Sequence, residues 1–165
     1  MTLLAINASH STSSSTHNLA FAATELAGQG RVVDLATLDP AALLGLGSDP
    51  DVSSLLEEIP HVSVLVVVSP IYRATYSGLL KVLFDQLAPE ALRGTAVVLA
   101  ATAGSSSHFL SIDTGFRSLI ASLGGWSVPS VVYATPSDLD DEKQPNDETR
   151  AQLAAALDEA ERLTR

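Results

Sequence analysis

The feature that most constrains the fold is the apolar run from Val62 to Val68, in which Ser63 is the one polar residue. Most of its residues are β-branched, and β-branched residues favour strands. A strand that is apolar along its whole length has no face suited to water, so both faces must be covered. The run is therefore predicted to be a central strand of a parallel sheet, ending at Ser69-Pro70.

Similar but shorter apolar runs recur along the chain and alternate with stretches of helical periodicity. The other predicted strands are Leu3–Ile6, Arg31–Leu35, Thr95–Ala101 and Ser127–Tyr133. Helices are predicted over 19–26 (with Gly28 as C-cap), 52–58, 78–87, 109–123 and 151–163, with a mobile acidic loop over 135–148.

This alternation predicts one α/β domain over residues 1–165, with a parallel sheet and right-handed crossovers. With five strands, the expected arrangement is flavodoxin-like, in the order 2-1-3-4-5, with helices on both faces. Ligands of such sheets bind beyond the carboxyl ends of the strands, where the strand order reverses.

Composition excludes several classes of function. The formal net charge of −10 argues against nucleic-acid binding, which needs a basic surface. The absence of cysteine excludes disulfides and thiolate chemistry, and the four histidines have no metal-ligand spacing, so no metal is expected. No apolar run is long enough for a membrane span and no signal peptide is recognised, so we expect a cytoplasmic protein that does not bind membranes.

The loop after the first strand, residues 8–16, is rich in hydroxyl groups and leads directly into a helix. Free N–H groups at a helix N-terminus form an anion site, which the helix dipole strengthens. This loop is therefore a candidate phosphate site. The alternative is a flexible serine-rich turn with an N-cap.

The loops after the third and fourth strands are suited to a flat ligand. Pro70 stiffens the first of these loops, and Tyr72 and Tyr76 can flank an aromatic ring system, unless they only pack on the surface. The second loop, Thr102–Ser107, is small enough for backbone to approach a ligand, although an ordinary tight turn has the same composition.

Longer motifs connect these loops to a known family. They are Ser69-Pro70-Ile71-Tyr72, Tyr76-Ser77-Gly78-Leu79-Leu80-Lys81 followed by Asp85, Ala101-Thr102-Ala103-Gly104, and His108-Phe109-Leu110-Ser111-Ile112-Asp113. Together they resemble the NAD(P)H-dependent FMN reductases, most closely the sulfonate-utilisation type of two-component monooxygenase systems.

The resemblance implies an FMN-binding domain that transfers hydride from NADPH or NADH to FMN and supplies reduced flavin to a partner monooxygenase. It implies no catalytic side chain, because the cofactors carry the chemistry. The implied FMN-binding residues are Ser9, Ser14, Ser15 and Thr16 at the phosphate, Pro70, Ile71 and Tyr72 along the isoalloxazine, and Thr102, Ala103 and Gly104 near its pyrimidine edge. A homodimer or homotetramer is also implied, with contacts through the helices that begin near Gly78 and His108.

Two departures from the family pattern affect these expectations. Ala8 and Ser11 stand where the family usually has glycine and arginine, and loss of the arginine removes a bidentate phosphate contact. We therefore expect FMN to bind weakly, as an exchanging substrate. Thr114 stands where some sulfonate-type reductases have tyrosine.

Three alternatives remain open from the sequence. One is a tightly FMN-bound reductase of quinones, azo dyes or metal oxyanions. Another is a flavodoxin-like electron carrier without an NAD(P)H site, which the acidic charge would suit. The third is a relative that has lost flavin together with the loop arginine.

Overall fold

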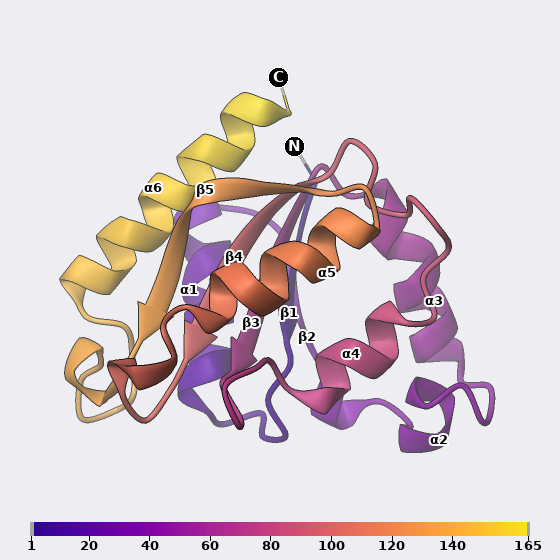
Figure 1. Ribbon diagram of the computed structural model, residues 1–165, viewed down its shortest axis with the longest axis horizontal. Helices are drawn as coiled ribbons and strands as arrows, with labels where there is room; N and C mark the ends of the chain where they lie inside the picture. Colours follow the sequence, from indigo (N-terminus) through magenta and orange to yellow (C-terminus); the bar gives the residue numbers. More distant parts are fainter. Residues whose placement is uncertain (1, 165) are drawn as a thin grey trace.

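The computed structural model describes residues 2–164 and contains one five-stranded sheet (Figure 1). Its order is β2-β1-β3-β4-β5 and all neighbouring pairs are parallel, which confirms the predicted topology. The strands are β1 (Leu3–Asn7), β2 (Arg31–Asp34), β3 (Val64–Pro70), β4 (Ala96–Thr102) and β5 (Trp126–Ala134).

Helices cover both faces of the sheet, as predicted (Figure 1). They are α1 (Ser15–Ala27), α2 (Pro40–Leu43), α3 (Pro50–Glu58), α4 (Gly78–Phe84), α5 (Arg117–Ser122) and α6 (Asp147–Leu163). Within residues 2–164, no helix is both long and apolar enough to cross a membrane.

The core has two layers because successive side chains of a strand point to opposite faces. Leu65 and Val67 of β3 pack in the layer beneath α3, α4 and α5, whereas Val64, Val66 and Val68 pack in the layer beneath α1 and α6. Every residue of β3 is buried, as predicted for a central strand. This rigid sheet fixes the positions from which the loops at its carboxyl edge emerge.

The first helix begins and ends where the sequence indicates. The Ser14 side chain accepts a hydrogen bond from the backbone N–H of His17 and thereby caps α1. Gly28 then ends the helix with a left-handed φ of 64°. The phosphate-loop candidate is consequently held against a well-defined helix N-terminus.

Some predicted boundaries were wrong. The helix predicted over 109–123 begins only after a turn, and its first part, Ile112–Phe116, is π-helical and leads directly into α5. Helix α2 lies in a stretch for which no helix was predicted, where Asp39 caps a helix that has Pro40 in its first turn. Helix α4 stops at Phe84, earlier than predicted, and α6 begins at Asp147 because Asn146 caps it.

Candidate functional site

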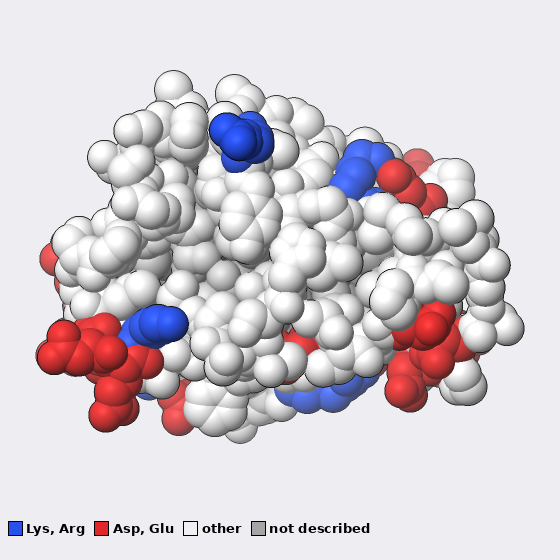
Figure 2. Space-filling view, turned by 90° about the horizontal axis from the view of Figure 1, so that it is seen from below, with Lys and Arg blue, Asp and Glu red and all other residues white. Residues whose placement is uncertain are grey.

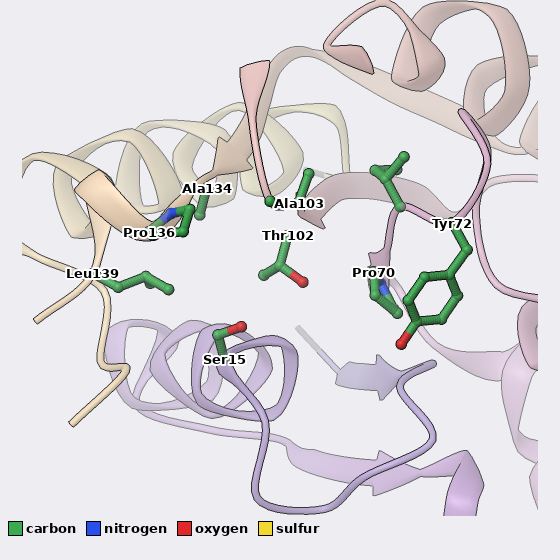
Figure 3. A pocket seen from close by; sticks show the side chains of 10 residues that line it. Ser15, Pro70, Tyr72, Thr102, Ala103, Ala134, Pro136 and Leu139 are labelled. Carbon is green, nitrogen blue, oxygen red and sulfur yellow. The ribbon is translucent and has the colours of Figure 1, made fainter. Parts of the chain in front are cut away.

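The loops after β1, β3, β4 and β5 meet at the carboxyl edge of the sheet around a shallow cleft (Figure 3). Its volume is about 280 Å³, near the lower limit of typical small-molecule sites, about 300 Å³. Seven residues predicted from the sequence line it: Ser15, Pro70, Ile71, Tyr72, Thr102, Ala103 and Gly104. Three further lining residues were not predicted: Ala134, Pro136 and Leu139.

The remaining candidates, Ser9, Ser14 and Thr16, lie in or beside the first loop but do not line this cleft. The Ser9 hydroxyl accepts the backbone N–H of Ser11, and Ser14 caps α1. The Thr16 side chain is buried and shares a hydrogen bond with Thr102. Within residues 2–164, the backbone N–H groups of Ser15 and Thr16 have no acceptor, which leaves them for an anion at the helix N-terminus.

Hydroxyl groups connect the loops to one another. Thr16 Oγ1 and Thr102 Oγ1 are 2.7 Å apart, which joins the start of α1 to the end of β4. Ser77 Oγ donates to the Ala8 carbonyl at 2.6 Å, and Ser77 N–H donates to Ser69 Oγ at 2.8 Å. All these groups are buried, so the walls of the cleft are fixed before any ligand arrives.

The loop after β3 forms a tight hairpin whose ends are Tyr72 and Thr75. Their backbone groups exchange hydrogen bonds of 2.9 and 3.2 Å. The two tip residues, Arg73 and Ala74, have φ values of 51° and 63°, a conformation that glycine or asparagine usually occupies. The hairpin sets Tyr72 at the wall of the cleft, beside Pro70 (Figure 3).

The two tyrosines of this loop have different environments. Tyr72 is 47% exposed, and its ring centroid lies 5.7 Å from that of His10. Tyr76 does not line the cleft but packs edge-on against the buried Phe116, with centroids 5.3 Å apart. Of the two tyrosines, Tyr72 lines the cleft and stays a candidate for contact with a ligand ring, whereas Tyr76 packs against the core instead.

The wall formed by Pro136 and Leu139 belongs to the segment predicted as a mobile loop. Thr135 and Asp138 form a capping box, and the Thr149 hydroxyl donates to the Asp138 carbonyl at 3.0 Å. The Asn18 side chain of α1 donates to two carbonyls farther along the segment. The Thr-Pro-Ser-Asp pattern was the available signal for this ordered turn, because threonine followed three residues later by an acidic residue favours a capping box.

The cleft itself carries no charge: none of its ten described lining residues is acidic or basic. Figure 2, which looks onto the carboxyl edge, shows acidic side chains gathered at opposite ends of this face, with a largely uncharged area between them and Lys or Arg side chains along its upper and lower borders. Burial raises the pKa of Tyr133, whose hydroxyl donates to the Ser105 carbonyl at 2.9 Å, so this phenol stays protonated at neutral pH. The lining of the cleft therefore offers hydrogen-bonding groups rather than cations to a ligand.

Two carboxylates near the family motifs have partners on their own helical segments. Asp113 accepts from Arg117 at 2.7 Å, and Asp85 pairs with Lys81. Both pairs have i, i+4 spacing, and neither carboxylate lines the cleft. The chemistry of the cleft is thus limited to hydroxyl groups, backbone amides and one aromatic ring.

Comparison with known proteins agrees with this geometry. The family model described as NADPH-dependent FMN reductase matches residues 1–140. The FMN reductase (NADPH) of Pseudomonas aeruginosa is 36% identical over 135 residues, which are 79% of this chain and 72% of the relative. The NADH-dependent FMN reductase SfnF of Pseudomonas fluorescens is 35% identical over 127 residues, 77% of this chain and 68% of the relative.

A solved structure extends the similarity over nearly the whole chain. The apo form of an NADH:FMN oxidoreductase superimposes with a TM-score of 0.82 at 32% identity, covering 96% of this chain and 87% of the other. The sequence motifs and the fold therefore agree with the comparisons. This chain belongs to the NADPH-dependent FMN reductase family.

Proposed function

We propose that this protein uses NAD(P)H to reduce FMN bound in the cleft at the carboxyl edge of the sheet, and that FMN enters and leaves as a substrate. The observation that carries the proposal is the convergence of seven predicted residues from three separate loops on one cleft in a member of this family. The shallow, uncharged cleft supports exchange rather than permanent retention of the flavin.

The donor set fits FMN. Its phosphate would accept hydrogen bonds from the N–H groups of Ser15 and Thr16 and from hydroxyls of the first loop, including Ser9 and Ser14. Pro70, Ile71 and Tyr72 would lie along the isoalloxazine. A Cβ built on Gly104 meets no atom within 4 Å, so backbone beside Thr102 and Ala103 is open to the pyrimidine edge.

The protein's own contribution to the reaction is orientation. Bound flavin supplies the hydride acceptor. The hydrogen bonds that hydroxyl groups make among the loops keep the cleft walls fixed, and Tyr72 gives a flat surface at one wall. Together these features would restrict the angle at which the flavin and nicotinamide rings can stack. No described side chain at the cleft is required as an acid or base.

Reduced FMN released from this site would pass to a flavin-dependent monooxygenase. Release is favoured because the first loop has Ser11 in place of a cationic contact to the phosphate. Among the relatives, one is named for NADPH and another for NADH, so both nucleotides are to be compared as hydride donors.

Exposed apolar side chains also favour assembly as a homodimer or homotetramer. Phe109 and Leu110, which follow the β4 loop, are 46% and 67% exposed. Tyr72 adds exposed aromatic surface at the wall of the cleft. A second subunit packed over this region would deepen the cleft. Light scattering at micromolar concentration is expected to give at least a dimer, and a monomer would contradict this assembly.

One assay separates the proposal from its alternatives. The purified protein is expected to be nearly colourless and to oxidise NADPH or NADH only after FMN is added. A yellow protein that retains flavin through dialysis and reduces quinones would instead be a flavin-retaining reductase. A yellow protein that does not oxidise NAD(P)H would be an electron carrier, and a colourless protein unaffected by FMN would have lost flavin binding.

A further inference from the structure

Three polar side chains from three elements meet behind the first loop. Asn7 Nδ2 at the end of β1 donates to Asp34 Oδ1 at the end of β2, at 2.6 Å. His17 Nδ1 in the first turn of α1 lies 2.7 Å from the same oxygen. Asn7 is fully buried, and the side chains of His17 and Asp34 are only 27% and 18% exposed.

Asn7 holds the first loop at two points. Its Oδ1 accepts the backbone N–H of Ser9 at 3.0 Å, and its Nδ2 also reaches the Ser11 carbonyl at 3.4 Å. An amide nitrogen donates to a carboxylate, whereas an amide oxygen cannot. Asp34 therefore determines which way the carboxamide faces, and with it the path of the backbone from Ser9 to Ser11.

His17 connects the same carboxylate to the helix. Its backbone N–H is the one that the Ser14 side chain caps, so the imidazole contact places the first turn of α1 against the end of β2. Asp34 thus forms hydrogen bonds with Asn7 and His17, the two residues that flank the first loop, residues 8–16, which contains Ser14, Ser15 and Thr16. The conformation of that segment decides where its free N–H groups point.

We propose that Asp34 is a positioning residue for the phosphate of FMN, acting through Asn7 and His17 rather than by contact. The proposal rests on the proposed function, because it assumes that FMN binds here. Contact between the carboxylate and the phosphate would be repulsive, so the benefit comes from the arrangement of N–H donors. That arrangement carries more of the phosphate affinity in this chain because Ser11 offers no cation.

The test compares FMN with riboflavin, which has the same ring and ribityl chain but no phosphate. Dissociation constants for both flavins would be measured by fluorescence quenching for the parent, Asp34→Ala, Asp34→Asn and His17→Ala, with a melting curve for each. Glu159→Ala is the matched control, since it removes a carboxylate that accepts two hydrogen bonds on β5, away from the first loop.

The readout is the preference for FMN over riboflavin. Asp34→Ala is expected to lower it by about tenfold or more, with the riboflavin constant almost unchanged. Asp34→Asn should keep most of the preference, because its amide oxygen can accept both hydrogen bonds. His17→Ala, which leaves the Asn7–Asp34 contact intact, should lower the preference by an intermediate factor. Glu159→Ala should lower stability without changing the preference.

An unchanged preference in Asp34→Ala and His17→Ala would overturn the proposal. So would an equal loss of affinity for both flavins, since that is the signature of a merely structural role. If Asp34→Ala does not fold, His17→Ala decides by the same criterion, and a large loss of the preference in Asp34→Asn would also contradict the proposal, because its amide oxygen can still accept both hydrogen bonds. A parent protein that neither binds FMN nor reduces it with NAD(P)H would instead overturn the proposed function itself.

Discussion

At the scale of single residues, Tyr72 and Tyr76 show how one residue type takes two roles within one loop. The hairpin between them turns Tyr72 toward the cleft and solvent, whereas Tyr76 packs against Phe116 and beside Gly115. A Cβ added to Gly115 would lie 3.4 Å from the Tyr76 ring. Removal of each ring should therefore affect a different property.

Tyr72→Ala is expected to weaken FMN binding by roughly tenfold or more. Aromatic stacking beyond simple burial contributes about 0.5–1.5 kcal/mol, lost burial adds to it, and about 1.4 kcal/mol corresponds to one decade. The fold should survive because this side chain is half exposed. FMN titration by fluorescence quenching gives the affinity, and Tyr72→Phe should behave almost like the parent.

Tyr76→Ala is the matched control for that change. It should lower the melting temperature, because it removes a ring from the core layer around Phe116, and leave the intrinsic FMN affinity near the parent value. Equal FMN affinity in Tyr72→Ala and the parent would show that the isoalloxazine lies elsewhere.

The tip of the hairpin offers a second test at residue scale. Ala74 has a φ of 63° and is exposed, so its Cβ is held in a region that costs about 1 kcal/mol or more for a residue other than glycine. Ala74→Gly is expected to raise the melting temperature by about 2–4 °C, measured by circular dichroism. Gly28→Ala, at φ 64° with open space around it, should lower it by a similar amount; the same sign for both would refute the argument.

The residues of the site could be predicted only in part from the sequence. Serine, proline and glycine in loops that follow apolar strands indicate ligand contact through strand topology, and seven of the ten candidates do line the cleft. Pro136 and Leu139 were missed because acidic composition suggested a mobile segment. The direction of Tyr76 was missed because it depends on packing against Phe116, distant in sequence.

At the scale of elements, β5 is an edge strand whose outer backbone groups need protection. Glu159 of α6 supplies it: its carboxylate accepts the Ser130 N–H at 2.9 Å and the Ser130 hydroxyl at 2.7 Å. These two hydrogen bonds lower the pKa of Glu159 below its ordinary value. The helix thus covers part of the edge with one charged group.

This contact predicts a pH-dependent difference in stability. The pKa of Glu159 is lower in the folded state than in the unfolded state. The ionised carboxylate therefore contributes its full stabilisation of the fold above the unfolded-state pKa, about 4.3. This stabilisation disappears as pH falls through the folded-state pKa. Glu159→Gln keeps one acceptor oxygen. It should therefore lower the free energy of unfolding by about 1 kcal/mol at pH 7, and by progressively less below about pH 4. Melting curves from pH 7 to pH 3 would measure the difference.

Asp158→Asn is the control for this experiment, because Asp158 is an exposed carboxylate on the same helix. Its substitution should change the melting temperature little at any pH. A Glu159→Gln penalty that stays constant down to pH 3 would mean that the Ser130 contact does not depend on charge.

Whole elements were predicted better than their boundaries. The apolar runs identified all five strands. The signal is strongest for β1, β3 and β4, which are buried along their whole length, and weaker for the edge strands β2 and β5, which are partly exposed. Helix α2 was missed because the glycines and prolines around it indicate loop, although Asp39 and Pro40 form a regular helix start. The π-helical stretch Ile112–Phe116 was missed because apolar spacing alone does not distinguish it from α-helix over so short a length.

At the scale of the whole molecule, the first expectation is stabilisation by the ligand. The proposed FMN cleft is lined by residues that follow four different strands, so only the folded chain provides it. At a hundredfold excess over its dissociation constant, FMN should add about 2.7 kcal/mol, or roughly 5–10 °C in melting temperature. Thermal scans with increasing FMN would show the shift, and no shift with FMN would contradict binding to the folded state.

The position of β1 also has a consequence for how the chain is made on the ribosome. The N-terminal strand lies inside the sheet: it pairs with β2 early, but Leu3 meets its other partner only when Val64 has been synthesised. The nascent chain therefore carries an open strand edge for a long interval, during which it can pair wrongly. The cleft itself is complete only once Leu139 has emerged, so flavin that binds the proposed site cannot guide the folding of the strands made before it.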